Sequence, residues 1–292
     1  MPVRYRSADE DSGRWVGFPF RDGDIVISTR SKSGTTWLQM VVALLVFQTP
    51  VLPRPLTELS PWLDWLITPK DEAYARLAAQ RHRRFIKTHT PLDGIVLDTR
   101  ATYIVVARHP LDAAVSLYHQ GNNLDRERIR ALTGQPASQE PSSPRPSLHE
   151  WLLSWIASEA SPDQQLDSLP GVMWHLSDAW ARRDQPNVVL VHYADLVADL
   201  EGEMRKLAGL LGISVPEDSW PDLVAAATFD SMRAGAQRTA PNPSSVLKDS
   251  SAFFRRGTSG AGAEVLNVDE MARYHARTSD LAPPDLLAWL HR

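Results

Sequence analysis

Four short runs of apolar, mostly β-branched residues recur along the chain. They cover residues 24–28, 84–88, 102–107 and 187–191. A continuous apolar run of this length is typical of a strand that is buried on both faces of a parallel sheet. The pattern therefore predicts a central sheet of four strands.

The longer segments around these runs have the spacing or the composition of helices. They cover residues 35–47, 70–81, 111–120, 148–157, 172–183, 197–211, 221–227, 269–277 and 284–290. Pro110 stands at the favoured start of one helix, and Gly212 supplies a stop for another. Strands that alternate with helices indicate a mostly parallel sheet with helices on both faces. Because no linker divides the sequence, we expect one α/β domain over residues 1–292.

Two stretches lack a clear period. Residues 121–147 are polar and rich in Pro, Ser and Gln, and residues 237–267 are rich in Ser, Pro and Gly. So long an irregular stretch inside a compact domain is usually a functional lid or a disordered loop. We therefore expect 121–147 to be a flexible lid or insertion.

Polar and cationic residues follow the ends of the predicted strands. They are Lys32, Lys87, His89, Arg108 and Tyr193. In an open α/β sheet, ligands bind outside the carboxyl ends of the strands. Polar residues also end strands simply because strands end in water. The cationic character of this rim in an acidic protein nevertheless favours an anionic ligand.

The loop between the first strand and the first helix is the clearest candidate site. Gly34 permits a tight turn before the helix, whose free N–H groups and positive end favour phosphate or a similar oxyanion. Lys32 adds a positive charge, while Ser33, Thr35 and Thr36 add hydroxyl donors. The order differs from a Walker A loop, in which the lysine follows the second glycine. An ordinary strand–helix turn with a chance lysine is the alternative.

Composition narrows the function classes. The chain has 292 residues, a formal net charge of −4 and no cysteine. An acidic chain argues against binding to nucleic acid, and the cysteine count excludes disulfides and thiolate metal sites. No carboxylates or histidines have metal-ligand spacing, so we expect no metal. The start has no apolar signal core, and no run reaches the ~20 residues of a membrane span. A cytoplasmic location is therefore expected.

The segment S-K-S-G-T-T-W, at residues 31–37, resembles the 5′-phosphosulfate loop of sulfotransferases that use 3′-phosphoadenosine 5′-phosphosulfate (PAPS). Further segments are similar to those of this family, in the same order: K-T-H at 87–89, Arg108 with Ser116, Y-A-D-L at 193–196, Thr228-Phe229 with Met232, and F-F-R-R-G at 253–257. The matches run from about residue 24 to 260. The resemblance implies an enzyme that moves a sulfuryl group from PAPS to a hydroxyl or amine of a small or lipid-like acceptor.

The resemblance also implies roles for individual residues. His89 corresponds to the catalytic base, a task that suits histidine near neutral pH. Lys87 lies close by at the same strand end, and Lys32 can neutralise the charge that develops on the leaving 3′,5′-ADP. The residues implied in nucleotide binding are Lys32, Ser33, Gly34, Thr35, Thr36, Trp37, Arg108, Ser116, Tyr193, Thr228, Phe229, Met232, Phe253, Arg255, Arg256 and Gly257. Of these, Trp37, Tyr193 and Phe229 either stack on adenine or belong to the core. His109 is a rival base.

Some features depart from the family pattern. After R-R-G, the usual Asp-Trp is absent, and the C-terminal segment through which family members dimerise has no counterpart, so the oligomeric state is open. The acceptor is also open. Two other functions compete with the enzyme: a P-loop kinase or NTPase with an aberrant loop, and a non-catalytic module that binds PAPS or its product.

Overall fold

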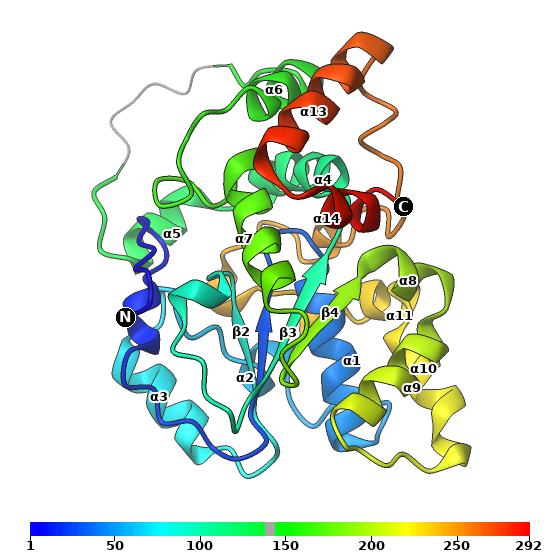
Figure 1. Ribbon diagram of the computed structural model, residues 1–292. Helices are drawn as coiled ribbons and strands as arrows, with labels where there is room; N and C mark the ends of the chain where they lie inside the picture. The colour runs from blue at the N-terminus through cyan, green and yellow to red at the C-terminus, as the bar shows by residue number, and fades with distance from the viewer. Residues whose placement is uncertain (138–143) are drawn as a thin grey trace.

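A parallel four-stranded sheet forms the centre of the protein, as seen in a computed structural model that describes residues 1–137 and 144–292. The strands are β1 (Ile25–Ser28), β2 (Phe85–Thr88), β3 (Thr102–Ala107) and β4 (Val188–His192), in the order β2-β1-β3-β4 (Figure 1). All three pairings are parallel. The four predicted strands and the α/β fold class are therefore confirmed, with shifts of one residue at some ends.

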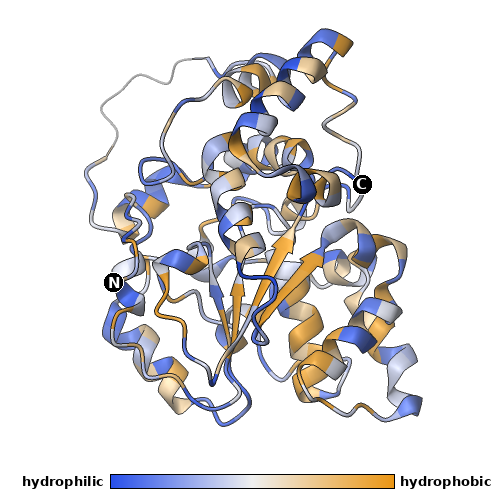
Figure 2. Cartoon of the chain, in the orientation of Figure 1, coloured by the Kyte–Doolittle hydropathy of each residue, from blue (hydrophilic) through white to orange (hydrophobic). Residues whose placement is uncertain are grey.

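The alternation of side chains along each strand divides the core into two halves. On β3, Ile104 and Val106 face one half, whereas Tyr103 and Val105 face the other. Helices α1, α2 and α8–α11 cover the first face, and α3, α4, α6, α7, α13 and α14 cover the second. Figure 2 shows that β3 and β4 consist largely of hydrophobic residues, as expected of strands covered by helices on both faces.

Fourteen α-helices occur in the described part of the chain. They are α1 (Thr35–Phe47), α2 (Leu56–Leu59), α3 (Lys70–Ala79), α4 (Pro110–Asn123), α5 (Arg126–Leu132), α6 (Leu148–Ile156), α7 (Leu169–Ala181), α8 (Tyr193–Ala198), α9 (Leu200–Leu210), α10 (Trp220–Ala227), α11 (Phe229–Ala234), α12 (Ala236–Thr239), α13 (Val268–Leu281) and α14 (Pro284–Leu290). The helix expected over 197–211 is wrong in detail. The chain forms α8 and α9 instead, because Asp199 leaves helical geometry and caps the Gly202 N–H at 2.8 Å.

The segment 121–147 contains more regular structure than its composition suggests. Helix α4 continues to Asn123, and α5 follows, capped by the side chain of Asp125. Ile129 on α5 is buried in a small cluster with Val246, and the Asp125 N–H donates to the Val246 carbonyl at 2.9 Å. Residues 138–143 of the expected lid lie outside the described residues. That the segment is a flexible lid or insertion stays a prediction.

The segment 237–267 is irregular after α12, as expected, but it is held in place. The carboxylate of Asp112 on α4 accepts hydrogen bonds from the N–H groups of Gly260 and Gly262, both at 2.8 Å. The segment therefore lies against the carboxyl ends of the strands. Across residues 1–137 and 144–292, no helix is both long and apolar enough to cross a membrane.

Candidate active site

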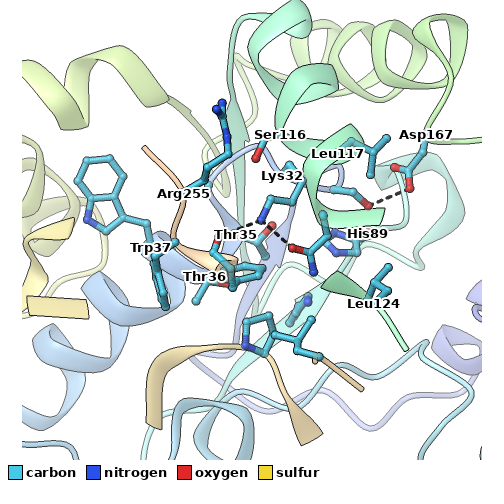
Figure 3. Close-up of a pocket in the computed structure, with 18 of the residues that line it drawn as sticks. Lys32, Thr35, Thr36, Trp37, His89, Ser116, Leu117, Leu124, Asp167 and Arg255 are labelled. Atoms are coloured by element: carbon cyan, nitrogen blue, oxygen red, sulfur yellow. Dashed lines mark hydrogen bonds between the residues drawn. The ribbon is translucent and has the colours of Figure 1, made fainter. Parts of the chain in front are cut away.

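A cavity of about 250 Å³ opens at the carboxyl ends of the strands (Figure 3). All the site residues expected from the sequence line it, except Ser33 and Thr228. The Ser33 N–H closes the loop onto the Arg30 carbonyl at 3.2 Å, and its side chain is buried. Thr228 caps α11, accepting from the Ser231 N–H and donating to the Ala225 carbonyl. The roles of these two residues in nucleotide binding remain predictions.

The loop between β1 and α1 adopts the geometry expected of an anion-binding turn. Lys32 and Gly34 have φ angles of 63° and 107°. A Cβ at Gly34 would lie 2.9 Å from the ring of Tyr193, so only glycine fits there. Helix α1 begins at Thr35, and the first N–H groups of a helix have no acceptor within it. The residues that carry these groups, 34–37, line the cavity, and such N–H groups can hold a phosphate or sulfate oxygen.

The ammonium of Lys32 lies inside the cavity. Its Nζ is 3.5 Å from Oε1 of Gln120 and from the carbonyl of Phe253, and 3.6 Å from the centroid of the Phe253 ring. Burial, together with the cations of Arg108, Lys87 and Arg255, lowers the pKa of Lys32 to about 7. A bound anion would counter both effects and restore the full charge.

His89 carries its free ring nitrogen at Nε2. A carbonyl can only accept, so Nδ1–H of His89 donates to the carbonyl of Thr29. Burial, with the cations of Lys87 and Arg30, holds the pKa of His89 well below its ordinary value. The ring of Trp62 packs at right angles to the imidazole, with centroids 4.6 Å apart. A neutral imidazole with an available Nε2 can accept a proton.

Lys87 lies beside His89 at the end of β2. Its Nζ is 3.8 Å from the centroid of the Trp62 ring. Burial lowers the pKa of Lys87 to about 8, and the carboxyl groups of Glu10 and Asp64 oppose that change. The pocket therefore contains a second lysine, which is mostly charged at neutral pH and loses its charge at a lower pH than an exposed lysine.

Two arginines that line the cavity, Arg108 and Arg255, lack carboxylate partners in the part of the chain that the structure describes. Arg108 donates to the carbonyls of Lys32 at 3.2 Å and Thr258 at 2.9 Å, and its guanidinium lies 4.4 Å from the centroid of the Tyr193 ring. The buried Nε atoms of Arg108 and Arg255 have no hydrogen-bond partner among the described residues. Cations that lack carboxylate partners suit an anionic ligand with several oxygens.

Arg256 differs from its neighbour. Both of its Nη atoms pair with the carboxylate of Glu264, at 2.8 and 3.1 Å, and the side chain is largely exposed. Arg255 forms no such pair within residues 1–137 and 144–292, and burial with the nearby Arg256 and Arg108 lowers its pKa. Of the two, Arg255 is the better placed for a phosphate.

Aromatic residues of α1, α8 and α11 also line the cavity. The indole N–H of Trp37 donates to the Ala227 carbonyl at 2.8 Å, and its ring packs against Tyr193 at 5.2 Å. A Cβ at Gly257 would lie only 2.5 Å from the ring of Phe229. Phe229 thus packs directly on the main chain of residues 253–258, which we call the closing segment, and it also lines the cavity.

The other end of the cavity contains residues that the sequence did not identify. Trp62 and Trp65 stack at 4.5 Å, and Trp65 joins Ile129 and Val246 in an apolar cluster. Glu10 also lines this part, and burial raises the pKa of its carboxyl to about 8. The two tryptophans, which follow a Pro-rich stretch, are the one sequence feature that could have indicated this end of the cavity. Their partners come from segments far away in the sequence.

Two further expectations from the sequence concern an alternative catalytic base and a metal ion. His109, the rival base, lies outside the cavity lining and packs on Tyr274 with ring centroids 5.9 Å apart. Among the residues that the structure describes, no group of three or more His, Asp or Glu side chains is arranged to hold a metal ion. The nitrogen and hydroxyl donors of the cavity instead match a ligand with several anionic oxygens.

Comparisons with known proteins identify the family of this chain. Residues 22–280 match the sulfotransferase domain family. A glycolipid sulfotransferase of Mycobacterium bovis is 44% identical, over 99% of this chain and 94% of the relative. The fold resembles a mouse sulfotransferase complexed with PAP (TM-score 0.70, 18% identity, 96% and 92% of the chains covered). It also resembles retinol dehydratase in complex with androsterone and PAP (TM-score 0.69, 20% identity, 94% and 86% covered). None of these relatives supports a kinase or a non-catalytic module, and the chain belongs to the sulfotransferase family.

Proposed function

We propose that this sulfotransferase takes its sulfuryl group from PAPS and transfers it to a hydroxyl or amine of a lipid-like acceptor, with a glycolipid as the leading candidate. The observation that carries the proposal is the convergence of Lys32, His89, Arg108 and Arg255 on one cavity at the start of α1. Lys32 on one side, and Arg108 and Arg255 on the other, would provide cationic groups for a ligand with phosphates at its 5′ and 3′ positions.

Lys32 and the N–H groups at the start of α1 would hold the 5′-phosphosulfate. In this arrangement the oxygen of the leaving phosphate gains negative charge beside the ammonium of Lys32. A charge that grows in the transition state is stabilised most by donors that are already in place. Lys32 would therefore assist departure of 3′,5′-ADP more than it assists binding.

His89 would accept the proton of the attacking hydroxyl. Its Nδ1–H is engaged by the Thr29 carbonyl, so Nε2 is the atom that takes the proton as the new S–O bond forms. Sulfuryl transfer resembles phosphoryl transfer, in which positioning and charge stabilisation dominate catalysis. Lys87, close to the same strand end, would stabilise the charge on the transferring group.

Arg108, Arg255 and Ser116 would bind the 3′-phosphate, with Arg256 in a weaker role. Support comes from the unpartnered Nε atoms of Arg108 and Arg255. The rings of Trp37 and Phe229 would enclose the adenine.

The acceptor would bind at the end formed by the tryptophans and α5. An apolar cluster that includes Trp65, Ile129 and Val246 lies beside the carboxyl group of Glu10. This mixture suits a molecule with an apolar part and several hydroxyls. The M. bovis relative is named a glycolipid sulfotransferase, which favours the same class of acceptor.

The test is a transfer assay with PAPS and a panel of alkyl glucosides, the matching alkyl alcohols and free glucose, all in the presence of EDTA. We expect mass spectrometry to detect a sulfated alkyl glucoside and 3′,5′-ADP in equal amounts. His89→Ala serves as the inactive control. No transfer to any panel member, or transfer that depends on Mg²⁺ and ATP, would contradict the proposal.

A further inference from the structure

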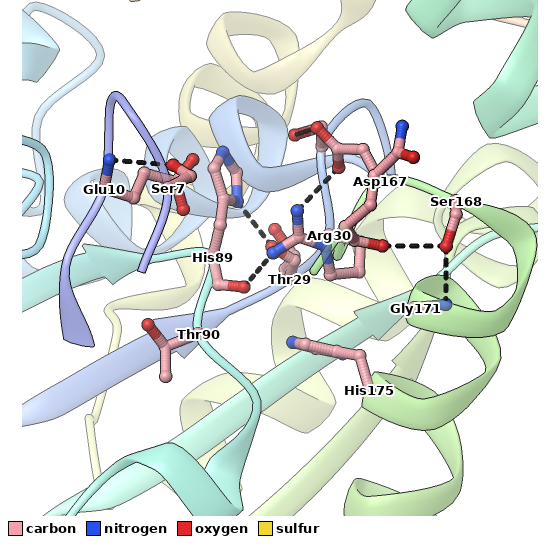
Figure 4. Close-up of polar contacts among 12 residues, drawn as sticks. Ser7, Glu10, Thr29, Arg30, His89, Thr90, Asp167, Ser168, Gly171 and His175 are labelled. Carbon is pink, nitrogen blue, oxygen red and sulfur yellow. Dashed lines mark hydrogen bonds and ion pairs between the residues drawn. The ribbon is translucent and has the colours of Figure 1, made fainter. Parts of the chain in front are cut away.

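Arg30 is a buried cation beside the site that does not line the cavity. It precedes Ser31 and Lys32 in the loop after β1, and its side chain is only 3% exposed. One Nη atom donates to the main-chain carbonyl of His89, and the other donates to Oδ1 of Asp167 at 2.6 Å (Figure 4). Burying a charge is costly unless it is paired, so the burial of Arg30 depends on Asp167.

Asp167 is itself firmly held. Its second carboxylate oxygen accepts from the Ser31 hydroxyl at 3.0 Å, and its carbonyl accepts from the Trp155 indole at 2.7 Å. The next residue, Ser168, caps α7 through the Gly171 N–H at 3.1 Å. Asp167 therefore fixes two neighbouring loop residues, Arg30 and Ser31, to the start of α7.

The loop contacts His89 at two points. Thr29 accepts from the imidazole Nδ1–H, and Arg30 donates to the main-chain carbonyl of the same residue. Both contacts come from the two residues that precede Ser31 and Lys32. The position of the imidazole is thus tied to the loop that also carries Lys32.

We propose that Arg30 and Asp167 are a positioning pair that holds the imidazole of His89 with Nε2 directed to the acceptor and fixes it to the loop of Lys32. The inference rests on the role of His89 in the proposed function. Neither residue touches the reacting atoms in this account, so both act through His89.

Electrostatics support this role. The cations of Lys87 and Arg30 and the ring of His175 on α7 all lower the pKa of His89, after burial. The carboxyl groups around this cluster are those of Asp64, which accepts from the hydroxyls of Thr88 and Thr90 on either side of His89, of Asp167, which pairs with Arg30, and of Glu10, which interacts with Arg30 and Lys87. Removing the charge of Arg30 must raise the pKa of His89, whereas neutralising Asp167 leaves the charge of Arg30 uncompensated and must lower it further. A residue that only stabilises the fold would produce no such opposite shifts.

The experiment follows the His89 ring directly by ¹⁵N NMR of the full-length protein without substrate, with His89→Ala used for assignment. We expect a neutral Nδ1–H tautomer in the wild type at pH 7. In Arg30→Met, the pKa should rise and the Nε2–H tautomer should become populated, and in Asp167→Asn the pKa should fall. Arg30→Lys should keep the pKa near the wild-type value while it loses the single tautomer, because an ammonium cannot contact both partners as a planar fork does.

Because this readout needs no PAPS or acceptor, failure of the proposed function would not affect it. The acidic limb of the pH profile of kcat/KM should move in the same directions.

The matched control is Asp24→Asn, which disturbs a buried Arg84–Asp24 pair at the amino ends of the strands. It should lower thermal stability and leave His89 unchanged. An unchanged pKa and tautomer in both Arg30→Met and Asp167→Asn, or equal shifts in the control, would overturn the inference; if Arg30→Met fails to fold, Asp167→Asn and Arg30→Lys decide it.

Discussion

The main-chain carbonyl of Lys32 accepts a hydrogen bond of 3.2 Å from Arg108. The same guanidinium donates to the carbonyl of Thr258 at 2.9 Å. Arg108 therefore connects the loop that carries Lys32 to the segment that closes the cavity. In the proposed function these are the two ends of one nucleotide, so binding at either end should order the other.

The two neighbouring arginines of the closing segment should differ in their effect on the nucleotide. Arg255→Ala should weaken binding of 3′,5′-ADP by ~10-fold or more, since a hydrogen bond to a charged group contributes ~1.5–3 kcal/mol. Arg256→Ala should have a smaller effect, because its guanidinium is already paired with Glu264. Titration calorimetry measures both. A larger loss in Arg256→Ala would reverse the assignment.

Gly257 should tolerate no side chain. Its φ of 69° is unfavourable for other residues, and a Cβ would contact the Phe229 ring at 2.5 Å. Overpacking of this kind costs ~1–3 kcal/mol, so Gly257→Ala should weaken 3′,5′-ADP binding by ~10-fold. Gly260→Ala is the control, because φ is 93° there but no atom lies within 4 Å of the Cβ position. Equal losses in the two variants would mean that strain alone, and not the Phe229 contact, is responsible.

Binding of the nucleotide should take up protons. Lys32 has its pKa lowered to about 7 in the free protein, and a bound anion raises it again. Affinity should therefore be level below about pH 7 and fall as the pH rises above it. Calorimetry near pH 8 in two buffers with different ionisation enthalpies measures the uptake. Lys32→Met should reduce it and leave the part due to Lys87, while the exposed Lys206→Met should leave it unchanged.

Removal of the base should separate chemistry from binding. A positioned base typically contributes ~10²–10⁴ in rate, so His89→Ala should lower kcat by that factor. Affinity for 3′,5′-ADP should stay nearly constant, since the imidazole holds no phosphate in this account. Single-turnover transfer and calorimetry on the same preparation provide both numbers. Wild-type turnover in His89→Ala would eliminate it as the base.

Much of the fold was predictable because it depends on local pattern. The apolar runs gave the four strands, and the carboxyl ends of parallel strands necessarily meet at one edge. That rule alone brought Lys32, Lys87, His89 and Arg108 together. The break at Asp199 was missed, because an aspartate fits both a helix interior and a cap, and only the geometry of the chain distinguishes them.

The end of the cavity proposed for the acceptor was not predictable, because it too depends on contacts between distant segments. It is assembled from Glu10, the Trp62–Trp65 stack, Ile129 and Val246, which share no motif and lie far apart in the sequence. Arg30 was equally hidden, since its role follows from a contact with Asp167 across 137 positions. The spacing of residues along the sequence predicts their contacts only when they belong to the same helix, strand or loop.

The most direct test of the account compares 3′,5′-ADP with 5′-AMP, which differ only in the 3′-phosphate. Two or three hydrogen bonds from Arg108, Arg255 and Ser116, at ~1.5–3 kcal/mol each, predict a preference of at least ~10²-fold for 3′,5′-ADP. Arg108→Ala should erase most of that preference and barely change the affinity for 5′-AMP. Equal calorimetric affinities of the wild-type protein for the two nucleotides would contradict the 3′-phosphate site and, with it, the use of PAPS.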